Sequence, residues 1–378
     1  MTRFVTRRQA LATGAAFGLA AQGLASSANA QATRSPAGAV AEESAAIEAL
    51  YQQAQAEGGK LVVYAGGDTA TQQDGTKKAF LDKFPKLDLQ IVVDYSKFHD
   101  VRFDNQRATA GAVPDVIQLQ TLQNYPRWKQ DGALSHFKPA GFAHIHPMFK
   151  DADGAWMAIG VIAFSYMVDT SVVGDKIPAS VNALSQPEWR GTIASTYPHD
   201  DDAALFLYKR YVETYGWSWL AAMARQDIQF ARGSHTPGLA VNQHQKAIGM
   251  AGSGSLLAPA TNPVKWMVPD EQPFLAWGQR AAIVKGAKNL AAAKLYMSWQ
   301  VSAERQLAAF NGWSIRTDVQ PKGNLKPVYD NPNGNVAEFV RFMEDRALTE
   351  RWRQTFAIYF GEVKGEPSPG WLGLRPGA

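Results

Sequence analysis

Short runs of apolar side chains alternate with stretches of helical spacing along the first third of the chain. The run KLVVYA at residues 60–65 stops at a Gly-Gly pair, and residues 87–93 alternate apolar and polar side chains. Two stretches with helical spacing, 68–84 and 99–109, separate these runs from each other and from a third, DVIQLQ at 115–120. Strand, helix, strand, helix and strand in this order predict parallel βαβ units whose helices cover the faces of a sheet.

A second set of such runs begins near residue 158. AIGVIAFSYMV, TIAST, DIQFAR and KAIGMAG predict strands, and a long helix is expected over 201–225. AAAKLYMSWQ and SAERQLAAF, near residue 300, have helical spacing again. We therefore predict two α/β lobes, joined by extended crossings near 160–166 and 271–278. Residues 31–42 are expected to form a mobile leader before the fold.

The first thirty residues have the pattern of an export signal. Arg3, Arg7 and Arg8 precede a mildly apolar, Gly- and Ala-rich stretch, and Ala28-Asn29-Ala30 fits the small-x-small cleavage rule. The stretch is too short and too interrupted to span a bilayer. A transit peptide or a buried helix is the alternative. We expect cleavage after Ala30, a periplasmic mature protein and no stable membrane insertion; the Arg-Arg pair leaves the twin-arginine and general routes both open.

Export changes the interpretation of the charge. The chain has 38 basic and 34 acidic residues, a net charge of +4, but cleavage after Ala30 removes three arginines and leaves +1. A nearly neutral mature chain does not indicate a nucleic-acid partner. The chain has no cysteine, so its stability must come from its core rather than from disulfides.

Five segments, in order, resemble the extracellular solute-binding proteins of bacterial ABC importers. They are KLVVYAGGDT; GAVPDVIQLQ with the following DGAL; IAFSYMVDT; SVNALSQPEWRGTIAST; and PFLAWGQRAAIVKGAKNLAAAKLYMSWQVSAERQ. The nearest group contains ferric-ion-, polyamine- and organic-anion-binding members. The resemblance implies an α/β protein of the type 2 periplasmic-binding fold, with two Rossmann-like lobes and a hinge of two crossing strands. We expect residues 31–160 plus 272–318 in the N-lobe, and 161–271 plus 319–378 in the C-lobe.

The resemblance also implies a function. Such a protein is not an enzyme and carries no cofactor; it is a monomer that captures a small-molecule solute between its lobes and delivers it to an ABC permease and its ATPase. In open α/β sheets, ligands bind at the carboxyl ends of the strands. The candidate ligand-binding residues at these ends are Gly67, Asp68, Thr69, Thr121, Tyr197, His199, Ser253 and Trp277, the last as a wall of the cleft.

The predicted solute is small, polar and anionic, or carries an oxyanion. Backbone amides and small hydroxyl groups in these loops suit negative charge. In the ferric-binding members a pair of tyrosines supplies iron ligands near residues 251–257, where this chain has Gly252-Ser253-Gly254-Ser255. That departure puts iron in doubt, and no metal site is predicted. A ferric-ion or polyamine binder of the same fold remains the alternative.

The stretch TYPHDDDAALF, residues 196–206, could support three kinds of site. One of its three aspartates could cap the following helix while the others complement the helix dipole. His199 with one aspartate could bind a metal, or the aspartates could face the cleft and favour a cation. Catalytic carboxylates usually come from separate elements, and no G-x-S-x-G motif occurs. A secreted hydrolase is therefore kept only as the alternative in which the protein is an enzyme and not a binding protein.

Overall fold

A single mixed sheet runs through the part of the chain that the computed structural model describes, which comprises residues 36–109, 111–308, 312–321 and 325–366. The predicted export signal and its cleavage site lie outside these residues. The strand order is β2-β1-β3-β9-β4-β7-β5-β6, and β8 pairs with β4. The strands are β1 (Lys60–Gly66), β2 (Asp88–Asp94), β3 (Val116–Leu119), β4 (Met157–Asp169), β5 (Ile193–Thr196), β6 (Gln229–Ala231), β7 (Ile248–Ser253), β8 (Val264–Met267) and β9 (Leu275–Ile283).

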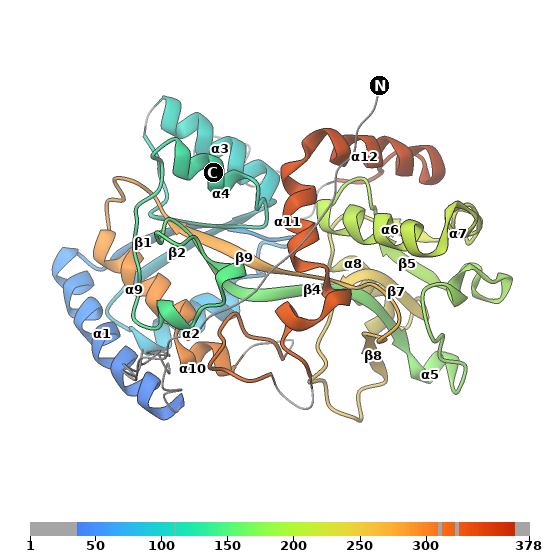
Figure 1. Ribbon diagram of the computed structural model, residues 1–378, viewed down its shortest axis with the longest axis horizontal. Helices are drawn as coiled ribbons and strands as arrows, with labels where there is room; N and C mark the ends of the chain where they lie inside the picture. The colour runs from blue at the N-terminus through green and yellow to red at the C-terminus, as the bar shows by residue number, and fades with distance from the viewer. Residues whose placement is uncertain (1–35, 110, 309–311, 322–324, 367–378) are drawn as a thin grey trace, which may run out of the picture. The chain divides into compact units, whose positions relative to one another are not determined.

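The first lobe is built on β1, β2 and β3, which are parallel as the βαβ pattern predicts. Its helices are α1 (Pro36–Glu57), α2 (Asp74–Lys83), α3 (Ser96–Ala108), α4 (Asn124–Gln130), α9 (Leu290–Val301) and α10 (Ala303–Leu307). Because strand side chains alternate between faces, Leu61, Val63 and Ala65 enter one buried cluster, whereas Tyr64 enters another with residues of α3 and α4. Figure 1 shows α3 and α4 on one side of these strands and α1 with α9 on the other.

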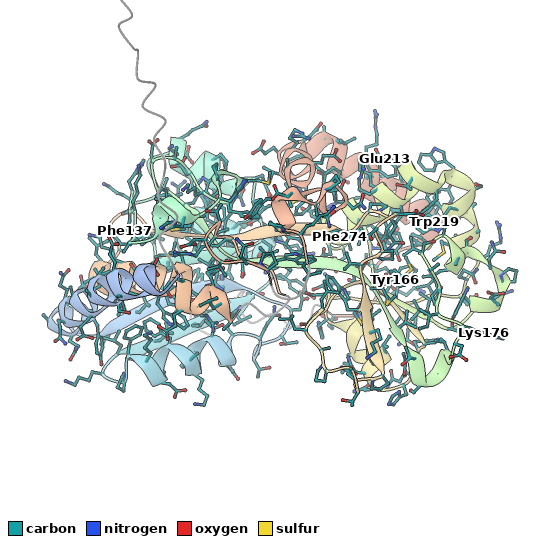
Figure 2. The ribbon with its side chains drawn as sticks, turned by 60° about the horizontal axis from the view of Figure 1, so that its bottom comes forward. Phe137, Tyr166, Lys176, Glu213, Trp219 and Phe274 are labelled. Carbon is teal, nitrogen blue, oxygen red and sulfur yellow. The ribbon has the colours of Figure 1, made fainter. Side chains whose placement is uncertain are left out.

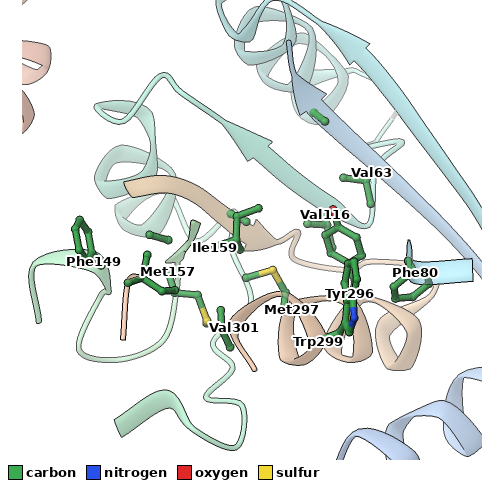
Figure 3. Packing of buried hydrophobic residues seen from close by; sticks show 14 of the residues in the cluster. Val63, Phe80, Val116, Phe149, Met157, Ile159, Tyr296, Met297, Trp299 and Val301 are labelled. Atoms are coloured by element: carbon green, nitrogen blue, oxygen red, sulfur yellow. The ribbon is translucent and has the colours of Figure 1, made fainter. Parts of the chain in front are cut away.

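The core of this lobe forms where α9 packs on the sheet. Tyr296, Met297 and Trp299 of α9 are 4% exposed or less, and they share a cluster with Val63 and with strand β4. Figure 3 shows Tyr296 beside Val116 and Met297 beside Ile159. The apolar run AAAKLYMSWQ therefore forms a helix that is buried along most of its length, because it packs against strands of the first lobe and also against crossing strand β4.

Two long antiparallel strands, β4 and β9, connect the lobes. Strand β9 pairs with β3 of the first lobe and with β4, and β4 continues to pair with β7 and β8. In this ladder Ile162 faces Trp277 and Ala158 faces Arg280. The predicted hinge of two crossing strands is confirmed. Strand β4 contains the first expected crossing, 160–166, whereas the second, expected near 271–278, begins only at Leu275 and continues to Ile283.

The second lobe is built on β5, β6 and β7, which are also parallel. Its helices are α5 (Thr170–Val173), α6 (Asp202–Tyr215), α7 (Trp217–Met223), α8 (Thr236–Asn242), α11 (Val336–Glu344) and α12 (Arg346–Phe360). Tyr166 of β4 and Trp219 of α7, both labelled in Figure 2, are buried. Their polar atoms donate to the carbonyls of Pro178 and Val181, so these large aromatic side chains fill the core without an unsatisfied donor.

Three predicted segments differ from the structure. The helix expected over 201–225 is broken at Gly216, whose φ of 85° only glycine adopts without strain, so α6 and α7 are separate. The helix expected from residue 68 begins at Asp74. The expected mobile leader is wrong from Pro36 onward, because α1 begins there and its Glu43 forms a buried ion pair with Arg316. Within the described residues, no helix has the length and hydropathy that crossing a bilayer requires.

Candidate functional site

The loops that follow strands β1, β2, β5 and β6 contact one another across the two lobes. Parallel pairing places the carboxyl ends of β1, β2 and β3 on one edge, and those of β5, β6 and β7 on another. In an open α/β sheet, the carboxyl ends of the strands are where helix N-termini and connecting loops present groups to a ligand. Two sets of side-chain contacts join the edges and locate the candidate solute site.

The first contact is made by Asp68, one of the predicted site residues. Its Oδ2 accepts hydrogen bonds from the backbone N of Ser234 at 2.7 Å and from the Ser234 Oγ at 2.5 Å. Nδ1 of His235 lies 3.8 Å from the same oxygen. Asp68 follows β1 and Ser234 follows β6, so this carboxylate bridges the strand ends of the two lobes.

The second contact centres on Asp200. Lys97, in the first turn of α3, donates from Nζ to the Asp200 carbonyl at 3.0 Å and to its Oδ1 at 2.8 Å. Arg232, after β6, donates from Nε to Oδ2 at 2.8 Å and from Nη2 to Oδ1 at 3.1 Å. A cation from each lobe thus binds one carboxylate. Burial acts to raise the pKa of Asp200, but the hydrogen bonds from Arg232 and the charge of Lys97 hold it below the ordinary value.

The other two aspartates of the DDD stretch serve the helix that follows them. Asp201 caps α6, since its Oδ1 accepts from the backbone N of Ala203 and of Ala204, both at 2.9 Å. Burial, with the charge of Asp68, raises the pKa of Asp201 to about 7. Asp202, in the first turn of α6, pairs with Arg346 and Arg353. The expectation that one aspartate caps the helix is confirmed for Asp201, and only Asp200 binds the opposite lobe.

Tyr197 and His199 turn toward their own lobe. Tyr197 is 6% exposed and stacks on Phe230, with ring centroids 5.2 Å apart. The His199 Nε2 lies 2.8 Å from the carbonyl oxygen of Gly361, and its Nδ1 is buried without a hydrogen-bond partner among the described residues. Burial lowers the pKa of His199, so the ring is neutral near pH 7. A solute contact from these two residues stays a prediction.

The remaining first-lobe candidates lie on the strand-end loops. Gly67 is buried, and a Cβ there would lie 2.6 Å from Val93 Cγ1, so its close packing requires glycine. Thr69 accepts at its carbonyl from Gln72 N in the turn before α2. The hydroxyl of Thr121, after β3, is buried and has no partner among the residues described. An unsatisfied buried hydroxyl at a strand end is a group that a bound solute or a water could satisfy.

Ser253 lies at the end of β7 and Trp277 lies on β9; a Cβ on Gly252, the residue before Ser253, would be 3.6 Å from the Ser234 carbonyl. Ser253 is exposed at the end of β7. The following Gly254 has Trp266 against it, 2.2 Å from where a Cβ would lie, so the glycine-rich stretch makes room for an indole. Trp277 is 3% exposed and packs edge-on against Phe164, with centroids 5.0 Å apart. In this structure Trp277 is a core side chain, and a role as cleft wall would need that packing to open.

The sequence reasoning missed Lys97, Arg232 and Ser234 as individual residues. Each follows the end of a strand by one to three positions, but the basic side chains of Lys97 and Arg232 gave no stronger signal than other surface lysines and arginines. Two of the contacts join loops that are far apart in the sequence: Lys97 is 103 residues from Asp200, and Ser234 is 166 residues from Asp68.

The site combines charged and hydroxyl groups from both lobes. Within the described ranges, no group of three or more His, Asp or Glu side chains is placed to hold a metal ion. Asp68 and Lys97 of the first lobe bind Ser234 and Asp200 of the second, and Arg232 binds Asp200 within the second lobe. Such a set can bind a polar molecule and couple its binding to the contact between lobes.

Comparison with known proteins identifies the family and the fold. The family model of the bacterial extracellular solute-binding proteins matches residues 112–321, which is more than half of the chain. An uncharacterized protein of Haemophilus influenzae is 23% identical over 318 residues, covering 78% of this chain and 90% of the relative.

Solved structures with the same fold include two binding proteins of different cargo. Iron-bound HitA from Pseudomonas aeruginosa has 16% identity and a TM-score of 0.59, covering 79% of this chain and 99% of HitA. The periplasmic binding protein AfuA from Actinobacillus pleuropneumoniae, with fructose-6-phosphate bound, has 17% identity and a TM-score of 0.61, covering 80% and 99%. The chain therefore belongs to the bacterial extracellular solute-binding proteins of ABC importers and has their type 2 periplasmic-binding fold.

Proposed function

We propose that this chain captures a small, polar, anionic solute between its two lobes and delivers it to an ABC permease. The lobes in this proposal comprise residues 31–160 plus 272–318 and residues 161–271 plus 319–378. The observation that carries the proposal is the position of Lys97 and Arg232, two cations from opposite lobes that bind the same carboxylate, Asp200.

The Asp200 carboxylate occupies a place that suits the carboxylate or phosphate of a solute. Charge-assisted hydrogen bonds of this kind are among the stronger polar contacts in proteins, and arginine matches oxyanions in a bidentate way. The side chains remain reachable, since those of Lys97 and Arg232 are 38% and 16% exposed. A solute anion would compete with Asp200 for these cations, and its binding would replace one bridge between the lobes with another.

The alternative is a cation, either a polyamine or ferric iron. It is favoured by the number of acidic residues near the strand ends and by the iron in HitA. However, each aspartate of the DDD stretch already has partners: Asp200 two cations, Asp201 two backbone amides and Asp202 two arginines. A cation would have to displace these contacts. The fructose-6-phosphate in AfuA is a phosphorylated anion of the kind proposed here.

Calorimetry on protein stripped of bound solute tests the proposal. The panel comprises inorganic phosphate, fructose 6-phosphate, succinate, spermidine and ferric iron. We expect an anion to bind, and Lys97→Ala to weaken that binding while Lys78→Ala, which changes an exposed lysine of α2, leaves it unchanged. Tight binding of spermidine or iron with no anion binding would overturn the anionic assignment, although not the family.

The alternative in which the protein is an enzyme is a secreted hydrolase with the same two-lobed fold. Ester, phosphate and glycoside substrates provide its test, because a binding protein should turn over none of them. Export is tested separately: N-terminal sequencing of periplasmic material should begin at Gln31, and an intact Met1 would contradict cleavage after Ala30. Size-exclusion chromatography tests the proposed monomer, and co-purification tests the permease and ATPase as partners.

A further inference from the structure

Asp68 brings a negative charge to the strand-end site, opposite in sign to the cations of Lys97 and Arg232. Its side chain is 16% exposed. The two donors that Ser234 offers to the Asp68 Oδ2, the backbone N and the hydroxyl, are both neutral. They satisfy this oxygen without supplying a positive charge, so a cationic donor in their place would bind the carboxylate more strongly.

His235 places a second polar atom beside the same carboxylate. Its Nδ1 lies 3.8 Å from the Asp68 Oδ2 and is buried, with no hydrogen-bond partner in the part of the chain that the structure describes. Gly233 permits this close approach, since its φ is 92° and a Cβ there would lie 2.8 Å from the His235 Nδ1. An unprotonated imidazole nitrogen accepts a hydrogen bond, so a donor placed between Asp68 and His235 would have two acceptors.

The Asp68 and Asp200 contacts are close enough for one small solute to reach both. The donors to these two carboxylates, Arg232 and Ser234, lie two positions apart in the loop after β6, so their Cα atoms are at most about 7 Å apart. Burial raises the pKa of Asp201, the residue after Asp200, to about 7, and the charge of Asp68 adds to this rise. The site therefore presents cations and a carboxylate side by side.

We infer that the transported solute carries an ammonium group as well as its anionic group, with the anion on Lys97 and Arg232 and the ammonium on Asp68. The inference rests on the proposed function and narrows it to a chemical class: an amino acid with a second acidic group, or an aminoalkyl phosphate.

Groups of the protein occupy the places of both parts of such a solute. The Asp200 carboxylate lies where the solute anion binds, and the Ser234 N–H and hydroxyl lie where its ammonium binds. An anion without an ammonium leaves Asp68 with its neutral donors, whereas a polyamine meets the repulsion of Lys97 and Arg232. A solute with both groups satisfies both halves of the site.

Two matched series of solutes test the inference, by calorimetry on the mature chain stripped of bound solute. Succinate, malate and aspartate differ by a hydrogen, a hydroxyl or an ammonium on one carbon. Ethyl phosphate, ethylene glycol monophosphate and phosphoethanolamine differ in the same way. In the series that binds, we expect the ammonium member to bind roughly tenfold or more tightly than the member without a donor, because it adds a charge-assisted hydrogen bond. The hydroxyl member should lie between them.

Variants of the Asp68 contact assign the difference to this carboxylate. Asp68→Asn removes the charge but keeps an acceptor for Ser234, so it should abolish the advantage of the ammonium member and leave the member without a donor within about twofold. Asp82→Asn is the matched control, since Asp82 is an exposed carboxylate of the same lobe that pairs with Lys78. Ser234→Ala provides a second variant: it removes a donor that the ammonium displaces, and it should tighten binding of the ammonium member alone.

The outcomes separate this inference from the proposed function. Equal affinity within each series, with binding still weakened by Lys97→Ala, would overturn the inference and leave the proposed function standing. An ammonium advantage that survives in Asp68→Asn, or that Asp82→Asn abolishes equally, would also overturn it. Binding of spermidine or ferric iron with no binding in either series would overturn the proposed function and the inference together.

Discussion

Two clusters of charged side chains in this protein use the same groups differently. Around Arg316, one buried cation contacts Glu43 at 2.7 Å, Asp318 at 2.7 Å and the Val301 carbonyl at 2.9 Å. Around Asp200, one carboxylate contacts two cations, Lys97 and Arg232. The first cluster has excess negative charge and is closed, with Arg316 and Glu43 side chains 0% and 5% exposed. The second has excess positive charge and remains partly open.

We propose that the difference separates a structural role from a binding role. The Arg316 cluster ties α1 to the segment after α10 within the first lobe, and none of its charges is left for a ligand. The Asp200 cluster joins the two lobes, and in the function proposed here its cations exchange Asp200 for a solute anion. A charge cluster with surplus charge of one sign, placed across a hinge, is what a protein needs to respond to a charged solute.

The largest expected loss of stability comes from removing the cation of the closed cluster, Arg316. Arg316→Met leaves Glu43 and Asp318 without their cation in a buried place, and breaking a buried pair in this way costs about 3–5 kcal/mol. Urea unfolding should show a loss of that size in the free energy of unfolding. A change below about 1 kcal/mol would mean that the cluster is no more structural than a surface pair.

A pH-dependent effect, spread over the interval between pH 4 and pH 7, should come from Asp201. Its pKa of about 7 in the folded protein lies above the ordinary value of 3.8, so between these values the folded state binds more protons than the unfolded state. Stability contributed by this group is therefore present at low pH and lost as the pH rises toward 7, by at most about 1.4 kcal/mol per pH unit. Urea unfolding at several pH values between 4 and 7 should show a flatter dependence in Asp201→Asn than in the wild type. Identical slopes would exclude this ionisation.

The smallest effect on stability should come from the open cluster. Lys97 is partly exposed, and pairs of that kind contribute about 0–1 kcal/mol. Lys97→Ala should therefore change the free energy of unfolding by less than that, close to Lys78→Ala, while weakening anion binding about tenfold. A large loss of stability without a change in affinity would reverse the assignment of roles to the two clusters.

The regular elements could be predicted from the sequence more completely than the site. The apolar runs at 60–65 and 158–168 predict β1 and β4 because strand burial depends on local side-chain pattern. The break at Gly216 was missed because apolar spacing continues through it. Pairing of Lys97 with Asp200, and of Asp68 with Ser234, depends on how distant strands associate, and no local pattern contains that information. Trp277, expected at the cleft, is buried because its neighbour across the ladder, Ile162, and Phe339 of α11 enclose it.

The most direct test of the account is the effect of Asp200→Asn on solute affinity, measured by calorimetry on stripped protein with the anion and cation panel. If a solute anion competes with Asp200 for Lys97 and Arg232, removing this charge should tighten binding of the anion about tenfold. Asp227→Asn is the control, because Asp227 pairs with Arg190 on the surface of the same lobe. Weaker anion binding in Asp200→Asn, or binding of spermidine or ferric iron that this variant abolishes, would contradict the account.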